Sequence, residues 1–401
     1  MIAYRKRQIE DYICREMRYY PAVLLTGPRQ VGKSTLLLHL KEDERTYVSL
    51  DDPELRDLAR LSPEIFFERF KPPLLIDEVQ YAPELLPYIK MIIDTEQTNN
   101  LFWLTGSQVF PLMRGVQEFL AGRVRILRLD GFSRKEGCGV EQPAFPRDLP
   151  TMAQEEASPF SIAEVIMRGS MPRVLFRDLP DVSGYYQSYV ESYIARDVRE
   201  ITNVMDSGLF RQFMSLLAMR TAQELNLAGL SKDLGIDSST VRRWLNVLVA
   251  SGLVLQLPAY SRNPGKRIIK RPKIHFCDTG LAAYLCGLRS VAAFEASLLR
   301  GSFFETWVVS EIAKSYRHNG LEPQLYYYRD SNQREIDLLV EHDGQLYPFE
   351  IKLGERPSHA ERNFAVLAAE EARIPFYGVL CPTRQMSPQS KKVWRIPVAL
   401  I

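Results

Sequence analysis

The amino-acid sequence predicts an α/β protein that begins with a parallel sheet, continues through a helical region and ends with a mixed α/β domain. Three observations support this order. Residues 21–130 alternate short apolar runs with amphipathic segments, residues 161–252 show mainly helical periodicity, and strand-like runs dominate roughly the last hundred residues. Strands that alternate with helices are typical of a parallel sheet covered on both faces.

The length and composition fit a soluble protein of more than one domain. At 401 residues the chain exceeds one ordinary core, since a domain holds roughly 100–200 residues. Its 46% hydrophobic and 25% charged residues are ordinary for a globular protein. The five cysteines show no C-x-x-C spacing, which argues against a disulfide framework or a zinc site. No long apolar run occurs and no apolar region follows the basic N-terminus, so we expect a cytoplasmic protein without a membrane span.

Five strand-like segments define the first predicted domain, residues 1–135. They are residues 22–26, 46–50, 74–76, 101–105 and 124–129. Helical patterns lie between most of them, which is the arrangement that connects parallel strands.

A glycine-rich motif follows the first strand. Residues 27–34 read GPRQVGKS, which fits G-x-x-x-x-G-K-[ST] between a buried strand and an apolar-periodic helix. Glycines let the backbone wrap an anion so that several N–H groups point at it, and the helix N-terminus adds partial positive charge. We therefore predict a P-loop that binds ATP and Mg²⁺. Its predicted binding residues are Gly27, Pro28, Arg29, Gln30, Val31, Gly32, Lys33, Ser34 and Thr35. Lys33 is expected at the β- and γ-phosphates, and the Ser34 hydroxyl on Mg²⁺.

Polar residues end two further strands of this domain. Asp77 and Glu78 follow an apolar strand, so we expect Asp77 to hold Mg²⁺ and Glu78 to polarise the attacking water as a general base. Thr105 and Ser107 end the next strand, which should lie beside the P-loop strand. Either hydroxyl could position that water or sense the γ-phosphate; the alternative is a simple polar strand end.

The order of these elements resembles a family of prokaryotic AAA-like ATPases that carry a poorly characterised second domain at the C-terminus. The motifs that carry the resemblance are DDP at 51–53, DEVQ at 77–80, TGS at 105–107 and LAGR at 120–123. The resemblance covers nearly the whole chain. It implies that Arg123 touches the γ-phosphate, either in the same chain or across the interface of a homo-oligomer; an ordinary salt bridge is the alternative.

The middle of the chain combines a breaker-rich connection with a basic helical module. Residues 136–204 form the connection and a helical region, and residues 205–272 resemble a winged helix-turn-helix. Residues 205–275 hold eleven Lys and Arg against four Asp and Glu, a charge of +7 in a chain of net +2. Such concentration predicts DNA binding through phosphates; protein contacts or a lid on the ATPase are the alternatives. The DNA-facing residues would be Ser238, Ser239, Thr240, Arg242 and Arg243 on the second helix and Arg262, Lys266 and Arg267 on the wing.

Four polar residues stand out in the last predicted domain, residues 273–401. Glu305 lies in an apolar helix, and Asp337, Glu350 and Lys352 lie on a predicted hairpin. Their order resembles restriction-endonuclease-like folds of the PD-(D/E)XK type, although no proline precedes Asp337. The resemblance implies that Asp337 and Glu350 hold Mg²⁺ or Mn²⁺, that Lys352 activates water, and that Glu305 completes the metal shell.

Two hypotheses from different classes follow. In the first, the chain is an ATP-dependent enzyme acting on DNA, and its ATP state controls a metal-dependent nuclease. In the second, ATP drives a switch that holds DNA or a protein, and the nuclease-like domain only binds. A processive motor ranks last, because no set of helicase motifs is present.

Overall fold

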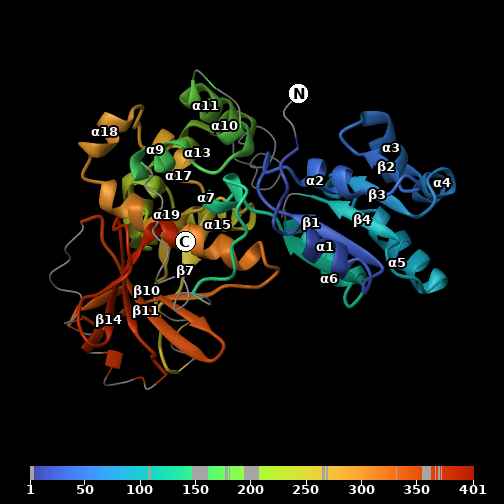
Figure 1. The fold of residues 1–401 in the computed structure, drawn as a ribbon. Helices are drawn as coiled ribbons and strands as arrows, with labels where there is room; N and C mark the ends of the chain where they lie inside the picture. The colour runs from blue at the N-terminus through green and yellow to red at the C-terminus, as the bar shows by residue number, and fades with distance from the viewer. Residues whose placement is uncertain are drawn as a thin grey trace.

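The computed structural model contains two β-rich bodies separated by helices (Figure 1). Figure 1 shows the first domain on one side and the C-terminal sheet on the other, with the segment before α1 running along their junction. The structure describes residues 4–106, 110–146, 161–176, 179, 181–193, 207–263, 267, 270–330, 332–354, 363–365, 367–368, 371 and 373–401.

The first sheet is fully parallel, as the alternating pattern predicts. Its strands are β1 (Ala22–Thr26), β2 (Thr46–Ser49), β3 (Leu74–Asp77), β4 (Phe102–Thr105) and β5 (Val124–Arg128). The strand order is β2-β3-β4-β1-β5, so β4 does lie beside the P-loop strand β1. All residues of β1, β3 and β4 are buried, which explains why these strands read as continuous apolar runs.

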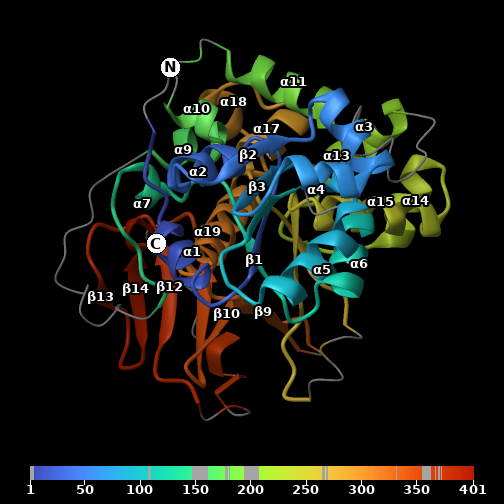
Figure 2. The same ribbon diagram turned by 90° about the vertical axis from the view of Figure 1, so that its right-hand side faces the viewer.

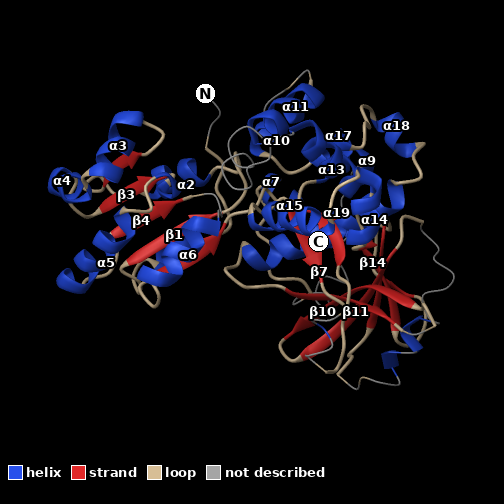
Figure 3. Cartoon of the chain, turned by 180° about the vertical axis from the view of Figure 1, so that it is seen from behind, coloured by secondary structure: helices blue, strands red, loops and turns tan. Residues whose placement is uncertain are grey.

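Helices cover both faces of this sheet (Figure 3). They are α1 (Glu10–Glu16), α2 (Lys33–Leu40), α3 (Pro53–Leu61), α4 (Pro63–Arg69), α5 (Leu85–Glu96) and α6 (Phe110–Phe119), with a short 3₁₀ turn η1 (Val79–Tyr81). Alternate residues of β1 enter different cores. Ala22 and Leu24 pack in a core local to this domain, whereas Val23 and Leu25 join a core that continues into the rest of the chain.

A helical region and a small antiparallel sheet follow. The helices are α7 (Arg134–Gly137), α9 (Ile162–Arg168), α10 (Pro172–Phe176), α11 (Val182–Tyr193), α13 (Ser207–Met219), α14 (Leu227–Leu234) and α15 (Ser238–Ala250). The strands are β6 (Gln223–Glu224), β7 (Val254–Leu257) and β8 (Lys273–Phe276), in the order β6-β8-β7. The α14–α15 turn has local causes, since Asn226 caps α14 and Gly235 ends it at φ 67°. Trp244 then packs α15 on Phe210 of α13.

The C-terminal part is a helix-flanked mixed sheet. The helices are α17 (Thr279–Leu285), α18 (Val291–Glu295) and α19 (Arg300–Arg317), and a 3₁₀ turn η3 (Val398–Leu400) ends the chain. The strands are β9 (Gln324–Arg329), β10 (Glu335–His342), β11 (Gln345–Ile351), β12 (Tyr377–Cys381), β13 (Ser387–Pro388) and β14 (Val393–Pro397), in the order β13-β14-β12-β11-β10-β9.

The predicted hairpin is confirmed. Strands β10 and β11 pair antiparallel, and Asp343 and Gly344 both have positive φ in the turn between them.

Helix α19 is the central element of the molecule. It lies between the helical region and the C-terminal sheet in two views (Figures 1 and 2). From Phe303 onward most of its side chains are buried. No helix in the described part of the chain is long and apolar enough to cross a membrane.

Candidate functional site

The P-loop joins the end of β1 to the start of α2. Gly27 and Gly32 have φ of 140° and 98°, values that side chains rarely adopt. A Cβ atom at Gly27 would lie 2.1 Å from the Leu129 carbonyl oxygen, whereas one at Gly32 would meet open space. The Nζ atom of Lys33 donates to the carbonyls of Gly27 and Pro28 at 3.0 and 2.9 Å. The lysine therefore lies along the loop, and the space in the side-chain direction of Gly32 is open.

Asp77 is the centre of a hydrogen-bond cluster below this loop. Its Oδ1 atom accepts from the Ser34 hydroxyl at 2.7 Å and from the Thr105 hydroxyl, and its Oδ2 atom accepts from Tyr47 at 3.2 Å. The parallel sheet causes this convergence, because β3 and β4 end at the same edge as β1. Hydroxyl and carboxylate oxygens are ligands that Mg²⁺ prefers, so Ser34 and Asp77 fit the predicted ion.

Glu78 has a constrained backbone. Its φ and ψ are 57° and 48°, its N–H donates to the Thr105 hydroxyl at 3.0 Å, and its carboxylate accepts from the Gln80 side chain. Thr105 thus connects the predicted metal ligand and the predicted base. Sequence reasoning missed Tyr47 and Gln80, although Gln80 lies in the DEVQ motif. Ser107 lies outside the described residues.

Arg123 does not lie at the P-loop of its own chain. It precedes β5, and its carbonyl accepts from Ala22 N, at the start of β1. The P-loop follows the other end of β1, so five strand residues, roughly 16 Å, separate the two places. The Arg123 side chain pairs with Asp94 at 2.6 Å. The alternative in which Arg123 reaches the nucleotide of its own chain therefore conflicts with the fold. The sequence already carried a sign of this, because Arg123 precedes a strand of the parallel sheet whereas the P-loop follows one.

Two later segments touch the P-loop directly. At Gly252, just after α15, a Cβ atom would lie 3.1 Å from Pro28 and 3.0 Å from the Arg128 guanidinium. From α11, the Tyr185 hydroxyl donates to the Gln30 side chain at 2.9 Å. The basic helical module and the helical region are therefore in contact with the loop that is predicted to bind nucleotide.

The four predicted C-terminal residues converge on one region between α19 and the β10–β11 hairpin. Asp337 Oδ2 accepts from the Ile351 N–H at 2.8 Å and from Lys352 Nζ at 2.9 Å. Lys352 Nζ also lies 2.7 Å from Glu350, which accepts from Asn363 at 2.9 Å. Lys352 is 42% exposed, while Glu350 is buried. The alternation along β11 thus brings Glu350 and Lys352 to one side.

A second lysine enters this cluster from the small sheet β6-β8-β7, although the sequence placed it at the start of the last predicted domain. Lys273 of β8 is buried, and its Nζ atom lies 2.8 Å from Glu305 and 2.6 Å from Glu335. Sequence reasoning missed Lys273 and Glu335, since each reads as an ordinary charged residue in a strand. Glu305 is therefore paired with an ammonium group.

Burial and mutual repulsion perturb these carboxylates. Burial, with the nearby charges of Asp337 and Glu335, raises the pKa of Glu305 to about 8 despite Lys273. Burial beside Asp337 raises the pKa of Glu350 to about 7. Burial also acts on Asp337, but Lys352 and Lys273 outweigh it and hold its pKa below the usual value. Asp337 and Glu350 are oxygen donors of the type that Mg²⁺ accepts, with the Lys352 ammonium between them. In the described part of the chain, no three His, Cys, Asp or Glu side chains are placed to hold a metal ion.

The predicted DNA-facing residues divide into two groups. On α15, the side chains of Ser238, Ser239, Arg242 and Arg243 are exposed, and Thr240 is half-buried. On the expected wing, Arg267 stacks on Tyr260 and Tyr326 at 4.7 Å, and Arg262 lies 3.9 Å from Glu371. Lys266 lies outside the described residues. Among the described residues, Arg242 and Arg243 on α15 are thus exposed without a contact to the C-terminal domain, whereas Arg262 and Arg267 contact that domain, although Arg262 stays 64% exposed.

Comparison with known families divides the chain into three matches. Residues 19–138 match the family described as "AAA domain". Residues 160–292 and 300–401 match two families described as domains of unknown function, DUF8612 and DUF4143.

Two curated relatives span nearly the whole chain. They are uncharacterized proteins of Mycobacterium bovis and Mycobacterium tuberculosis, each 29% identical over 396 residues, which covers 98% of this chain and 83% of theirs. Solved structures are more distant. A Walker-type ATPase of Pyrococcus abyssi has a TM-score of 0.42 at 14% identity, over 69% of this chain and 94% of that one. RuvB of Thermotoga maritima has a TM-score of 0.30 at 19% identity, over 66% of this chain and 88% of that one.

Proposed function

We propose that this chain couples Mg²⁺-dependent ATP hydrolysis to DNA binding and metal-dependent phosphodiester cleavage. The proposal starts from the AAA-type P-loop ATPase domain that residues 19–138 form. The observation that carries the coupling is that the basic module and the preceding helical region both contact the P-loop. Gly252 packs on Pro28, and Tyr185 bonds Gln30. A change in the P-loop on nucleotide binding would act directly on both contacts.

Each residue of the ATPase site has a role that its position supports. Lys33 would exchange its carbonyl partners for phosphate oxygens, and Ser34 and Asp77 would hold the magnesium ion. Glu78 would accept a proton from the attacking water, while Thr105 and Gln80 keep its backbone and carboxylate in place. When bound, the ion supplies positive charge that stabilises the transferring phosphoryl group.

The DNA-binding proposal rests on residues 205–272, the predicted winged helix-turn-helix, together with β8, which starts at the predicted boundary and pairs with β7. The order of elements supports it: a helix, a short strand, two helices and a two-stranded hairpin, with the strands in one sheet. Helix α15 would contact phosphates or base edges through Arg242 and Arg243, which are exposed. Since Arg262 and Arg267 contact the C-terminal domain, the wing would contribute less than α15.

The cleavage proposal rests on Asp337, Glu350 and Lys352. Asp337 and Glu350 would hold the metal ion once Lys352 moves from between them, which its partial exposure allows. Lys352 would then orient the attacking water and stabilise charge on the phosphate. The sheet supports this assignment, because α19 packs against β11, which carries Glu350 and pairs with β10.

The second candidate is an ATP-gated binding switch with an inactive C-terminal site. Its supporting observation is Lys273, whose ammonium bonds two of the carboxylates in that region. A carboxylate held by a buried ammonium is a poor metal ligand unless the lysine withdraws.

Fluorescence anisotropy with a labelled DNA duplex tests the coupling. Wild type and Lys33→Ala would be titrated without nucleotide, with ADP and with a non-hydrolysable ATP analogue. We expect the DNA affinity of wild type to change with nucleotide and that of Lys33→Ala to stay constant. Equal wild-type affinities in all three states would reject the coupling, and no binding in any state would reject the DNA partner.

A further inference from the structure

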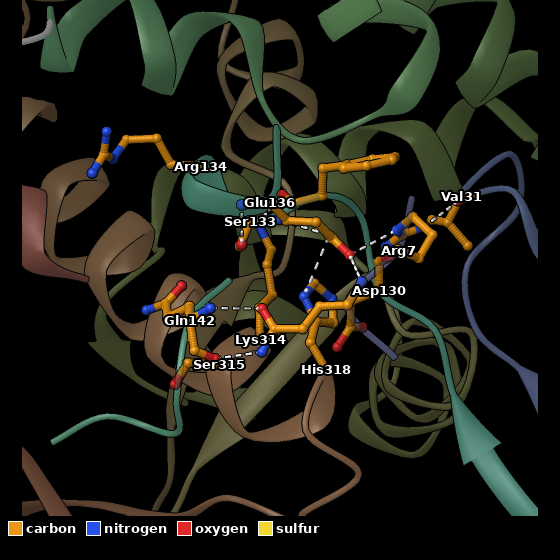
Figure 4. Close-up of polar contacts among 12 residues, drawn as sticks. Arg7, Val31, Asp130, Ser133, Arg134, Glu136, Gln142, Lys314, Ser315 and His318 are labelled. Carbon is orange, nitrogen blue, oxygen red and sulfur yellow. Dashed lines mark hydrogen bonds and ion pairs between the residues drawn. The ribbon is translucent and has the colours of Figure 1, made fainter. Parts of the chain in front are cut away.

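Arg7 is a buried arginine in the segment that precedes α1. It is 3% exposed, and its guanidinium stacks on the Phe132 ring with 4.0 Å to the ring centroid. Figure 4 shows it where the P-loop, the end of β5 and the last turns of α19 meet. In sequence it is the third member of a basic run, Arg5-Lys6-Arg7, which reads as a solvated terminus.

Each nitrogen of this guanidinium has its own partner. Nη1 donates to the Val31 carbonyl at 2.9 Å, and Nη2 donates to the Asp130 carbonyl at 2.8 Å. Nε donates to the Glu136 carboxylate at 3.0 Å, and that side chain is also buried. The planar fork of an arginine suits such divergent acceptors, whereas a lysine offers one point charge.

The bond to Val31 acts on the P-loop itself. In a planar trans peptide, the carbonyl of one residue and the N–H of the next point in opposite directions. Arg7 holds the Val31 carbonyl, so the Gly32 N–H points away from Arg7. The space beside Gly32 is open, and P-loop N–H groups bind phosphate. We propose that Arg7 is a positioning residue for nucleotide: it keeps the Val31–Gly32 peptide turned with its N–H toward the anion.

The same guanidinium connects the loop to α19. Glu136 lies 3.4 Å from His318 Nδ1, directly after α19, and Asp130, whose carbonyl Arg7 binds, pairs with Arg317 at 3.1 Å. Helix α19 carries Glu305 near its other end. A displacement of the P-loop would therefore reach the C-terminal end of α19, the helix that flanks the carboxylate cluster.

Several charged groups surround Arg7, and the Glu10 carboxylate accepts from its backbone N–H. The others are Arg128, Asp130, Glu136, Lys314 and Arg317, with His318 beside them. Burial outweighs Glu136 and lowers the pKa of His318, so the ring is neutral and Arg7 is the main cationic partner of Glu136.

Arg45 offers a matched control. It is also buried, stacks on Trp103 at 4.0 Å, donates to two backbone carbonyls, and pairs with Glu42 at 3.0 Å. Those carbonyls belong to Asn100 and Leu101, which precede β4 at the edge of the sheet opposite the P-loop. Arg45→Gln therefore removes a comparable set of interactions away from the nucleotide site.

The test measures the affinity of a fluorescent ATP analogue and the KM and kcat of ATP hydrolysis for wild type, Arg7→Gln, Arg7→Lys and Arg45→Gln. We expect Arg7→Gln to weaken nucleotide binding about 10- to 100-fold, the loss of one charged hydrogen bond, with KM changing more than kcat. Arg7→Lys should lie between wild type and Arg7→Gln. Arg45→Gln should lower the unfolding midpoint and leave the affinity unchanged.

The inference deepens the proposed ATPase function, and the two can fail separately. If wild type binds no nucleotide, the ATPase proposal fails. If wild type binds but Arg7→Gln binds equally well, or loses no more affinity than Arg45→Gln, the role of Arg7 is rejected. If Arg7→Gln does not fold, Arg7→Lys takes its place in the test. The role of Arg7 is then rejected if Arg7→Lys binds the ATP analogue as tightly as wild type does.

Discussion

The ammonium group of Lys273 lies 2.8 Å from a carboxylate oxygen of Glu305, although β8 and α19 belong to different parts of the chain. Glu335 shares the same ammonium at 2.6 Å. Together with Asp337, Glu350 and Lys352, the region holds four carboxylates and two ammonium groups. These six groups sum to −2 when all are ionised, and the Arg329 guanidinium, 3.3 Å from Glu335, adds one positive charge beside them.

This arrangement predicts that stability falls as pH rises from 7 to 8. A folded-state pKa of about 8 at Glu305 means that the folded protein keeps a proton that the unfolded chain has lost. The unfolding free energy should therefore decrease by up to about 1.4 kcal/mol per pH unit per such group. Glu350, with a pKa of about 7, adds to this loss of stability mainly below pH 7. Buried His275 and His318 have lowered pKa values, so their effect has the opposite sign: below pH 6.5 they make the unfolding free energy increase as pH rises.

Urea denaturation of wild type and Glu305→Gln between pH 7 and 8 checks this prediction. Glu305→Gln should flatten the slope, and Glu350→Gln should leave most of it in place. An unchanged slope in Glu305→Gln would contradict the raised pKa.

Replacing Lys273 should favour metal binding. Lys273→Met frees Glu305 and Glu335 from their ammonium partner, so we expect Mn²⁺ to bind about tenfold or more tightly than to wild type, as measured by calorimetry at pH 7.5. Lys314→Met is the control, because Lys314 is also buried and paired on α19, with Glu311 at 2.8 Å, outside the cluster. Equal Mn²⁺ affinity in wild type and both variants would show that Lys273 does not restrain the site.

Glu78→Gln should separate ATP binding from hydrolysis. Loss of a general base lowers kcat by about 10²- to 10⁴-fold, while the P-loop contacts that bind ATP remain. Thr105→Val should lower kcat by about tenfold, since the hydroxyl bonds both Glu78 N and Asp77. Phosphate release and nucleotide affinity would be measured in parallel, with the exposed Glu96→Gln as control. Wild-type turnover in Glu78→Gln would assign the base elsewhere.

Arg242 and Arg243 should account for part of the salt dependence of DNA binding. Removing one arginine–phosphate interaction reduces the slope of log K against log salt concentration by about one, so the slope of the double alanine variant should be smaller by about two. Arg18→Ala, an exposed arginine of the first domain, should leave the slope unchanged. A slope equal to that of wild type in the double variant would place the DNA-binding surface away from α15.

The first domain could be predicted nearly strand by strand, for a physical reason. Strands buried on both faces must be apolar throughout, and the P-loop needs its glycines and Lys33 at set spacings. The convergence of Asp77 and Thr105 followed from the topology, since parallel strands end at one edge. Arg123 was misleading because its family motif suggested a role that its own position before β5 does not allow in the same chain.

The contacts between residues far apart in the chain could not be predicted. Lys273 and Arg7 read as solvated charges, because nothing local in the sequence distinguishes a lysine or arginine whose partner lies far along the chain. The partner of Lys273 at Glu305 is 32 positions away, and the partner of Arg7 at Glu136 is 129 positions away. Such contacts depend on tertiary packing alone; Arg7 connects the P-loop to the end of α19, and Lys273 connects the small sheet to the C-terminal carboxylates.

The most direct test of the central claim is a cleavage assay on supercoiled and linear DNA with Mg²⁺ or Mn²⁺, with and without ATP. We predict cleavage by wild type, its loss in Asp337→Ala, and a change in rate with ATP that disappears in Lys33→Ala. Intact DNA under every condition, with ATP hydrolysis still measurable, would contradict the nuclease claim and favour the ATP-gated binding switch.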